Sequence, residues 1–156
     1  MSLSRRGFLA ASAVTAAAPA VPVVPAQSEQ KRRNGADILA AEGYKRLRDR
    51  KVGVLTNPTG VLADLTHLVD DMVANQVRPV AVFGPEHGFR GTAQAGGSEG
   101  DYTDPRTGIP VYDAYNVTVD KLAAMYRKAG VDTVVFDIAN VGARFYTYTW
   151  TMFIAM

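Results

Sequence analysis

Three short apolar runs constrain the fold of this chain more than any other sequence feature. They lie within residues 51–57, 79–83 and 131–138, are rich in β-branched residues, and each ends at polar or turn-forming residues. Continuous apolar runs of this length, without polar alternation, are typical of strands that are buried on both faces of a parallel sheet. The runs therefore predict an α/β fold built around such a sheet.

Helical patterns separate the three predicted strands. Apolar residues recur at helical spacing over residues 65–75 and 119–129, and Gly130 is placed to cap the second of these helices. A further helix is expected to begin at Asn34, which is a good N-cap, and a last one at about Tyr148. The resulting β-α-β-α-β alternation predicts helices on both faces of the sheet.

The N-terminus resembles a twin-arginine (Tat) export signal. Arg5 and Arg6 precede Phe-Leu and an Ala-rich apolar stretch over residues 8–20. That stretch is shorter than the roughly 20 apolar residues that span a bilayer, so no stable membrane span is expected. Cleavage is expected after Ala26, with an earlier cut within the Ala-rich stretch as the alternative. The predicted location is the periplasm or the cell-wall side, with the Tat translocase as a partner during export.

This signal divides the chain into a signal peptide at residues 1–26, a polar linker at 27–34 and a folded part at 35–156. The whole chain has 17 Lys and Arg against 15 Asp and Glu, and the signal holds two arginines and no acid, so the remainder is formally neutral at 15 against 15. A nucleic-acid-binding protein usually needs a clustered basic face. No nucleic acid partner is therefore expected.

Polar sequence follows each predicted strand. In open parallel sheets, ligands bind beyond the carboxyl ends of the strands. Asn57 follows the first strand within a Thr-Asn-Pro-Thr-Gly segment, for which a simple Asx-Pro turn and a substrate-binding role are both open. Asp137 lies at the end of the third strand.

The end of the second predicted strand has the largest number of candidate catalytic and binding residues. Glu86 and His87 are adjacent and lie in a nine-residue segment, 83–91, that is rich in Gly and Pro and includes Arg90. Glycines such as Gly88 let the backbone bend and a ligand approach closely. A carboxylic acid in such a place suits a general acid or base. The alternative is a surface turn with an incidental Glu-His pair.

The third strand end leads into an aromatic segment. Arg144 follows a Gly-Ala pair, and Tyr146 offers an aromatic face, so this segment suits a sugar or a carboxylate ligand. A packed core cluster is the preferred interpretation for the three remaining aromatic residues, which are Phe145, Tyr148 and Trp150.

Several classes of site are excluded or disfavoured by what the sequence lacks. The chain has no cysteine, which excludes thiolate catalysis and zinc-thiolate or iron–sulfur sites. The two histidines, His67 and His87, lie on different elements, and His67 is expected to be exposed on the second helix. No dinucleotide fingerprint and no serine-hydrolase elbow occur. We therefore expect no metal and no cofactor.

Four segments in this order resemble the NamZ-type exo-β-N-acetylmuramidases, a family long described as a domain of unknown function. They are residues 54–60, 83–91, 107–112 and 141–148. The resemblance implies a Rossmann-like N-terminal domain, a smaller C-terminal domain and an active site between them. It also implies release of terminal N-acetylmuramic acid from peptidoglycan fragments, in cell-wall turnover or recycling.

The resemblance also implies roles for residues at the strand ends. Glu86 is the best catalytic candidate, His87 would orient it or bind sugar hydroxyls, and Asp137 is a candidate for the second catalytic carboxyl group. Arg144 is a candidate for the lactyl carboxylate of the substrate. Four more residues could line the pocket, namely Asn57, Gly88, Arg90 and Tyr146.

The chain departs from the family pattern at two points. Asn140 stands where the family usually has a carboxylate, and Ala139 stands where it has an amide. The chain also ends at Met156 within a predicted helix, so the sheet is expected to be incomplete at the C-terminus. Both departures keep open an alternative, which is a non-catalytic module that binds wall sugars or an inactive truncated fragment.

Overall fold

The computed structural model describes residues 33–156. The predicted signal peptide and all but the last two residues of the predicted linker lie outside the described residues.

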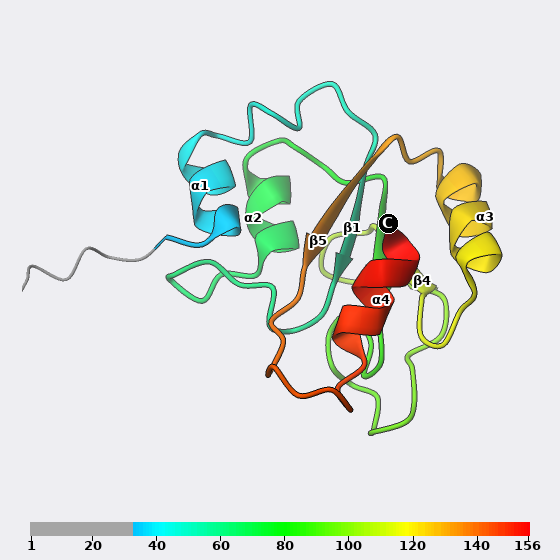
Figure 1. Ribbon diagram of the computed structural model, residues 1–156. Helices are drawn as coiled ribbons and strands as arrows, with labels where there is room; N and C mark the ends of the chain where they lie inside the picture. The colour runs from blue at the N-terminus through cyan, green and yellow to red at the C-terminus, as the bar shows by residue number, and fades with distance from the viewer. Residues whose placement is uncertain (1–32) are drawn as a thin grey trace, which may run out of the picture. The chain divides into compact units, whose positions relative to one another are not determined.

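Within residues 33–156, a five-stranded sheet is covered by two helices on each face (Figure 1). This arrangement confirms the predicted α/β class. One face carries α1 (Gly35–Ala41) and α2 (Leu68–Ala74). The other carries α3 (Val119–Ala129) and α4 (Tyr148–Ala155).

The sheet has the order β3-β4-β2-β1-β5. The strands are β1 (Val52–Thr56), β2 (Ala81–Gly84), β3 (Tyr102–Thr103), β4 (Pro110–Asp113) and β5 (Thr133–Asp137). All neighbouring pairs are parallel except β3 and β4, which are antiparallel. After β1, the chain adds β2 and β4 on one side and then returns to place β5 on the other. The order therefore reverses between β1 and β5, which is where open α/β sheets bind ligands.

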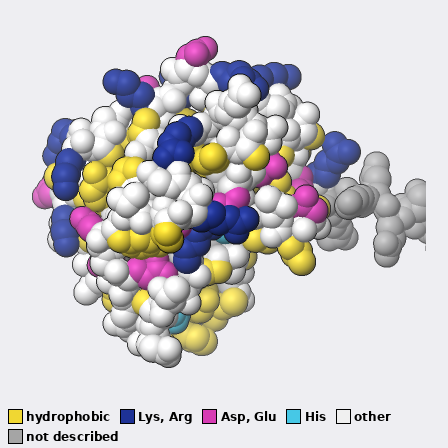
Figure 2. Space-filling model, turned by 180° about the vertical axis from the view of Figure 1, so that it is seen from behind, with side chains coloured by type: hydrophobic (Ala, Val, Ile, Leu, Met, Phe, Trp, Pro, Cys, Tyr) yellow, Lys and Arg dark blue, Asp and Glu magenta, His cyan; other side chains and the backbone are white. Residues whose placement is uncertain are grey.

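Charged side chains are dispersed over the surface that Figure 2 shows. Lys and Arg side chains lie around this face with acidic side chains between them, and they do not gather into one basic patch. Among the helices of residues 33–156, none is both long enough and apolar enough to span a membrane.

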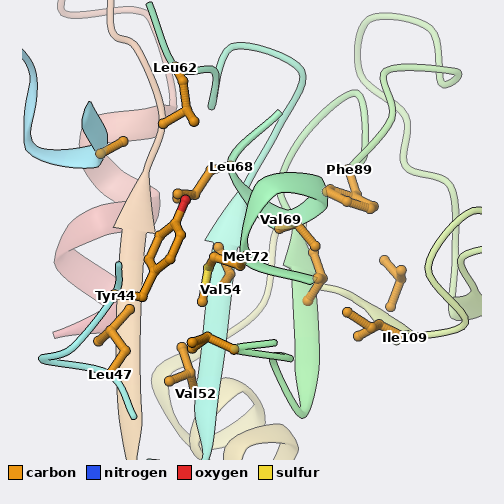
Figure 3. Close-up of a cluster of buried hydrophobic side chains, with 14 residues drawn as sticks. Tyr44, Leu47, Val52, Val54, Leu62, Leu68, Val69, Met72, Phe89 and Ile109 are labelled. Carbon is orange, nitrogen blue, oxygen red and sulfur yellow. The ribbon is translucent and has the colours of Figure 1, made fainter. Parts of the chain in front are cut away.

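Two apolar clusters fill the layers on either side of the sheet. Alternate residues of β1 serve both layers, because Val52 and Val54 pack toward α1 and α2, while Leu55 packs with Phe83 toward α3 and α4. Figure 3 shows the first cluster, in which the ring of Tyr44 lies among apolar side chains from β1 and α2. Burial of one large apolar side chain stabilises a fold by about 1.5–3 kcal/mol.

Local capping explains where the helices begin and end. Asn34 forms a reciprocal capping box with Asp37, and the Thr118 side chain accepts from the Lys121 backbone N–H at the start of α3. Gly130 ends α3 in the left-handed region at φ +70°. The predicted bounds of α3 and its glycine cap are confirmed.

Three details differ from the sequence predictions. His67 is not exposed on a helix but is the N-cap of α2, where its Nδ1 accepts from the Val69 backbone N–H at 3.2 Å. Phe145 and Trp150 are 87% and 64% exposed, so the predicted aromatic core cluster is confirmed only for Tyr148. The third difference is that β3 and β4, which lie in a Gly- and Asp-rich region, had no counterpart among the predicted strands.

Arg90 ties the long segment between β2 and β4 to α2. Its guanidinium makes bidentate contacts with Asp104, at 3.1 and 2.8 Å, and with Asp70, at 3.2 and 2.9 Å. It also lies over the ring of Phe89, 4.1 Å from the centroid. Burial opposes ionisation of Asp104, but hydrogen bonds from Arg90 and Thr107 prevail and lower the pKa of Asp104 to about 2.

We predict that Arg90→Met destabilises the fold by about 3–5 kcal/mol at neutral pH, because it leaves the buried Asp104 carboxylate without a cation and leaves Asp70 with only the exposed Arg106. Urea unfolding measures this loss. Because the pKa of Asp104 is lowered in the folded protein, this carboxylate stabilises the fold. The stabilisation is fully present above about pH 3.8 and is lost as the pH falls through about 2. The difference in unfolding free energy between variant and parent should therefore narrow at acidic pH, as the Asp104 carboxyl group takes up a proton. Arg46→Met, at an exposed pair with Glu42, is the control and should have little effect.

Candidate functional site

The candidate site lies at the carboxyl edge of the sheet, where β1, β2 and β5 end. Thr56 is level with Asp137 in the parallel pairing of β1 and β5, and the Thr56 hydroxyl donates to the Asp137 backbone carbonyl at 2.7 Å. Glu86 comes two residues after the end of β2, which pairs with the other edge of β1. The sheet thus brings three of the predicted site segments to one edge.

Two donors from different parts of the chain hold the Glu86 carboxylate. Its Oε1 accepts from the Gly96 backbone N–H at 2.9 Å, and its Oε2 accepts from the Thr147 hydroxyl at 2.9 Å. These two hydrogen bonds lower the pKa of Glu86, with a smaller contribution from the neighbouring His87. A carboxylate of this kind is ionised at neutral pH and remains partly exposed to a ligand.

The backbone turns sharply directly after Glu86. His87 has φ +69° and Gly88 has φ +82°, and a left-handed conformation is uncommon for a residue with a side chain. The His87 ring lies with Nδ1 3.3 Å from the Ala93 carbonyl oxygen, and its backbone N–H donates to the Gly97 carbonyl at 3.1 Å. His87 therefore faces the loop that follows and is fixed by it.

Tyr148 connects the first and second strand ends. Its hydroxyl donates to the Glu86 backbone carbonyl at 3.3 Å, and the Asn57 side chain is close enough to influence the pKa of this hydroxyl. Asn57 is 2% exposed, and its Oδ1 accepts from both the backbone N–H and the hydroxyl of Thr59, at 3.0 and 2.7 Å. The Asx turn that the sequence left open is thus present, and Asn57 is buried within it.

Asp137 lies at the same sheet edge but on the side of α1. Asp137 lines a hollow of about 540 Å³ together with residues of α1, Arg46 and Leu68. Its Oδ2 is buried, and within residues 33–156 it has no hydrogen-bond partner. Burial raises the pKa of Asp137, with a smaller contribution from Asp37. The structure does not bring Asp137 into hydrogen-bonding contact with Glu86, whose partner Thr147 precedes α4 on the opposite face.

Arg144 and Tyr146 lie on the loop between β5 and α4. Both line a hollow of about 620 Å³, and Thr147, the partner of Glu86, lines the same hollow. The Tyr146 ring packs edge-on against Tyr148, with centroids 4.8 Å apart. Arg144 is exposed and has no ion-pair partner among the described residues. The predicted Arg144 and Tyr146 therefore adjoin the Glu86 region, whereas Arg90 is engaged by two carboxylates.

Sequence reasoning missed the residues that hold Glu86 in place. Thr147 lies within a segment that was noted for Arg144 and its aromatic residues, and Gly96 contributes a backbone N–H that no side-chain pattern reveals. Tyr148 was assigned to the core; it is buried, but its hydroxyl also serves the site. Within residues 33–156, no group of three or more potential metal ligands comes together.

Comparisons with known proteins agree with this arrangement. The family described as "Exo-beta-N-acetylmuramidase NamZ, N-terminal" matches residues 52–156. A twin-arginine translocation signal matches residues 2–22, which confirms the predicted export signal and indicates export.

One curated relative is the "Peptidoglycan beta-N-acetylmuramidase NamZ" of Bacillus subtilis (strain 168). It is 44% identical over 127 residues, which are 81% of this chain and 30% of the relative. Two crystal structures of DUF1343 family proteins from Bacteroides fragilis superpose with TM-scores of 0.65 and 0.60, at 35% and 31% identity. Each match covers 80% of this chain and 30% of the solved chain.

The chain thus spans about 30% of the length of the proteins that it matches. The family match covers all three strand ends with their polar segments in full, and it begins at the first residue of β1. On this evidence the chain belongs to the NamZ exo-β-N-acetylmuramidase family, in the N-terminal region of that family.

Proposed function

We propose that the protein expressed from its complete reading frame is a glycoside hydrolase that releases terminal N-acetylmuramic acid from peptidoglycan fragments. The single observation that carries this proposal is the Glu86 carboxylate, held by two donors at the carboxyl edge of the sheet, within a segment that the family shares. The Bacillus subtilis relative acts, by its name, on the same class of polymer. The export signal delivers the chain to the compartment where peptidoglycan lies.

The two candidate carboxyl groups differ in their environments, and this difference suggests their roles. Hydrogen bonds lower the pKa of Glu86, which suits a general base or nucleophile. Burial raises the pKa of Asp137, which suits a proton donor. Because β1 lies between β2 and β5, the backbone ends of these two strands are roughly 9.5 Å apart.

The remaining predicted residues fit a substrate-binding wall. Arg144, exposed and without an ion-pair partner among the described residues, is proposed to pair with the lactyl carboxylate of the muramyl group. Tyr146 is proposed to contact the sugar, whereas Asn57, which is buried, is proposed to support the pocket wall through its turn, with His87 and Gly88 shaping the turn after β2. Arg90 is proposed to contribute through the loop that it anchors, since Asp70 and Asp104 occupy its guanidinium. We also retain the proposed division into a signal at 1–26, a linker at 27–34 and a catalytic-domain portion at 35–156.

A second candidate function is a module that binds wall sugars without cleaving them. Asn140, which stands in place of the usual family carboxylate, favours this alternative because its amide is used within the loop. Its side chain hydrogen-bonds Thr149, and its Oδ1 accepts from the Gly142 backbone N–H at 3.2 Å. Isothermal titration with muramyl ligands separates the two functions, since binding without any hydrolysis supports the module.

We predict that Glu86→Gln lowers kcat/KM for a chromogenic muramide by about 10²–10⁴-fold, because the amide cannot accept a proton at neutral pH. The assay uses the protein expressed from its complete reading frame. Glu42→Gln, an exposed change of the same type beyond α1, is the matched control and should leave turnover unchanged. Undiminished turnover in Glu86→Gln would remove Glu86 from the mechanism.

We also predict that Thr147→Val moves the acidic limb of the kcat/KM profile to higher pH. The valine has a similar shape but donates no hydrogen bond, so the pKa of Glu86 should rise toward its ordinary value. Glu86 would then lose its charge at a less acidic pH. Thr147→Ser keeps the hydroxyl and should restore the parent profile. An unshifted acidic limb in Thr147→Val would show that the profile reports some other group.

A further inference from the structure

Glu99 is the most heavily hydrogen-bonded acid near the candidate site, and no role has been assigned to it above. Its Oε2 accepts from the backbone N–H of Phe89 at 3.0 Å, from that of Arg90 at 3.4 Å and from the hydroxyl of Tyr102 at 2.8 Å. Its Oε1 accepts from both the backbone N–H and the hydroxyl of Thr92, at 2.9 and 2.8 Å. Five donors therefore converge on one partly buried carboxylate.

The segment that follows Glu86 is shaped to receive this carboxylate. Neighbouring backbone N–H groups that point into one concavity form an anion-binding nest, and here the occupant is a side chain of the same chain. A Cβ added at Gly88 would lie 2.2 Å from the Glu99 Cδ, so only glycine leaves room for the side chain. Burial opposes ionisation of Glu99, but hydrogen bonds from Thr92 and Tyr102 prevail and lower its pKa.

The same segment returns to Glu86 through backbone contacts. Between Thr92 and Glu99 the chain folds back so that the Gly96 N–H donates to Glu86 Oε1 at 2.9 Å. The Gly97 carbonyl accepts from the His87 backbone N–H at 3.1 Å. Glu99 thus fixes one end of a loop, and residues 96 and 97 of that loop contact Glu86 and His87.

A second anchor of this region is independent of Glu99. The Arg90 guanidinium is bound by Asp70 and Asp104 through contacts that Glu99 does not share. Loss of the Glu99 carboxylate should therefore free residues 92–98 while leaving Arg90 attached to α2. A purely structural anchor would change the stability of the fold, whereas the contacts described here predict an effect on the carboxylate of Glu86.

We propose that Glu99 is a positioning residue for Glu86, because by filling the backbone nest it holds the Gly96 N–H against the Glu86 carboxylate. This inference rests on the proposed catalytic role of Glu86. Glu99 makes no hydrogen bond with the Glu86 side chain, and it acts on that side chain through the loop of residues 92–98.

The test compares Glu99→Gln with the parent chain by NMR. Glutamine has nearly the same size as glutamate, but its NH₂ group cannot accept hydrogen bonds from the N–H and hydroxyl donors that surround this position. We expect the Gly96 amide to exchange faster with solvent and the carboxyl carbon of Glu86 to titrate at higher pH. In protein from the complete reading frame, we expect kcat to fall about 10- to 100-fold with KM nearly unchanged.

Two further variants keep the test decisive. Tyr102→Phe removes only one hydroxyl donor and should shift the Glu86 titration less but in the same direction, which covers the case in which Glu99→Gln does not fold. Glu42→Gln, remote from this loop, should leave the Gly96 exchange and the Glu86 titration unchanged. A folded Glu99→Gln or Tyr102→Phe variant with an unaltered Glu86 titration would overturn the proposal. Because NMR reads the carboxylate directly, this outcome is distinct from a failure of the proposed activity.

Discussion

Strand β1 is hydrogen-bonded along both edges and packed on both faces, and the candidate site depends on that position. All five of its residues are buried, with β2 paired on one edge and β5 on the other. Gly53 keeps the strand close to its neighbours, because a Cβ there would lie 2.8 Å from the Phe83 ring. This packing fixes where β1, β2 and β5 end relative to one another, so the residues that follow them are delivered to one edge of the sheet.

Glu86 and Asp137 lie at that edge in different environments, and this difference shifts their pKa values in opposite directions. Glu86 remains partly exposed and is stabilised as a carboxylate by the Gly96 N–H and the Thr147 hydroxyl. Asp137 ends a neighbouring strand but has a buried oxygen without a donor among the described residues, so its neutral form is favoured. Strand pairing places the two strand ends at one edge of the sheet. Hydrogen bonds at Glu86 and burial at Asp137 then shift the pKa values of the two acids in opposite directions.

The sequence allowed the parts of the fold that depend on local patterns to be predicted. The apolar runs predicted β1, β2 and β5, and the apolar spacing over residues 119–129 with Gly130 after it predicted the bounds of α3. The strands β3 and β4 were not predicted because they are short, and because β4 is held mainly by pairing with β2, which is distant in sequence. The capping role of His67 depends on its bonds to Val69 and to the Asn57 carbonyl, and helical periodicity carries no signal for either.

The candidate site was predictable to a similar degree and for the same reason. Glu86 stood out because glycines and proline surround it, which is a local signal. Thr147 and Gly96 act through contacts across 61 and 10 residues, and no spacing rule reveals them. The exposure of Phe145 and Trp150 likewise depends on which surfaces meet in three dimensions.

The absence of cysteine gives the charged anchors of the β2–β4 segment their significance. An exported protein can use disulfides to fix long loops, but this chain has none and must fix residues 85–109 by other means. Arg90 ties the segment to α2 through two carboxylates, and Glu99 closes it through backbone donors. Hydrogen bonds to charged groups contribute about 1.5–3 kcal/mol each when they are shielded from water. Unlike a disulfide, such anchors remain sensitive to pH, so the order of the loop that carries Glu86 is coupled to the ionisation of Asp104 and Glu99.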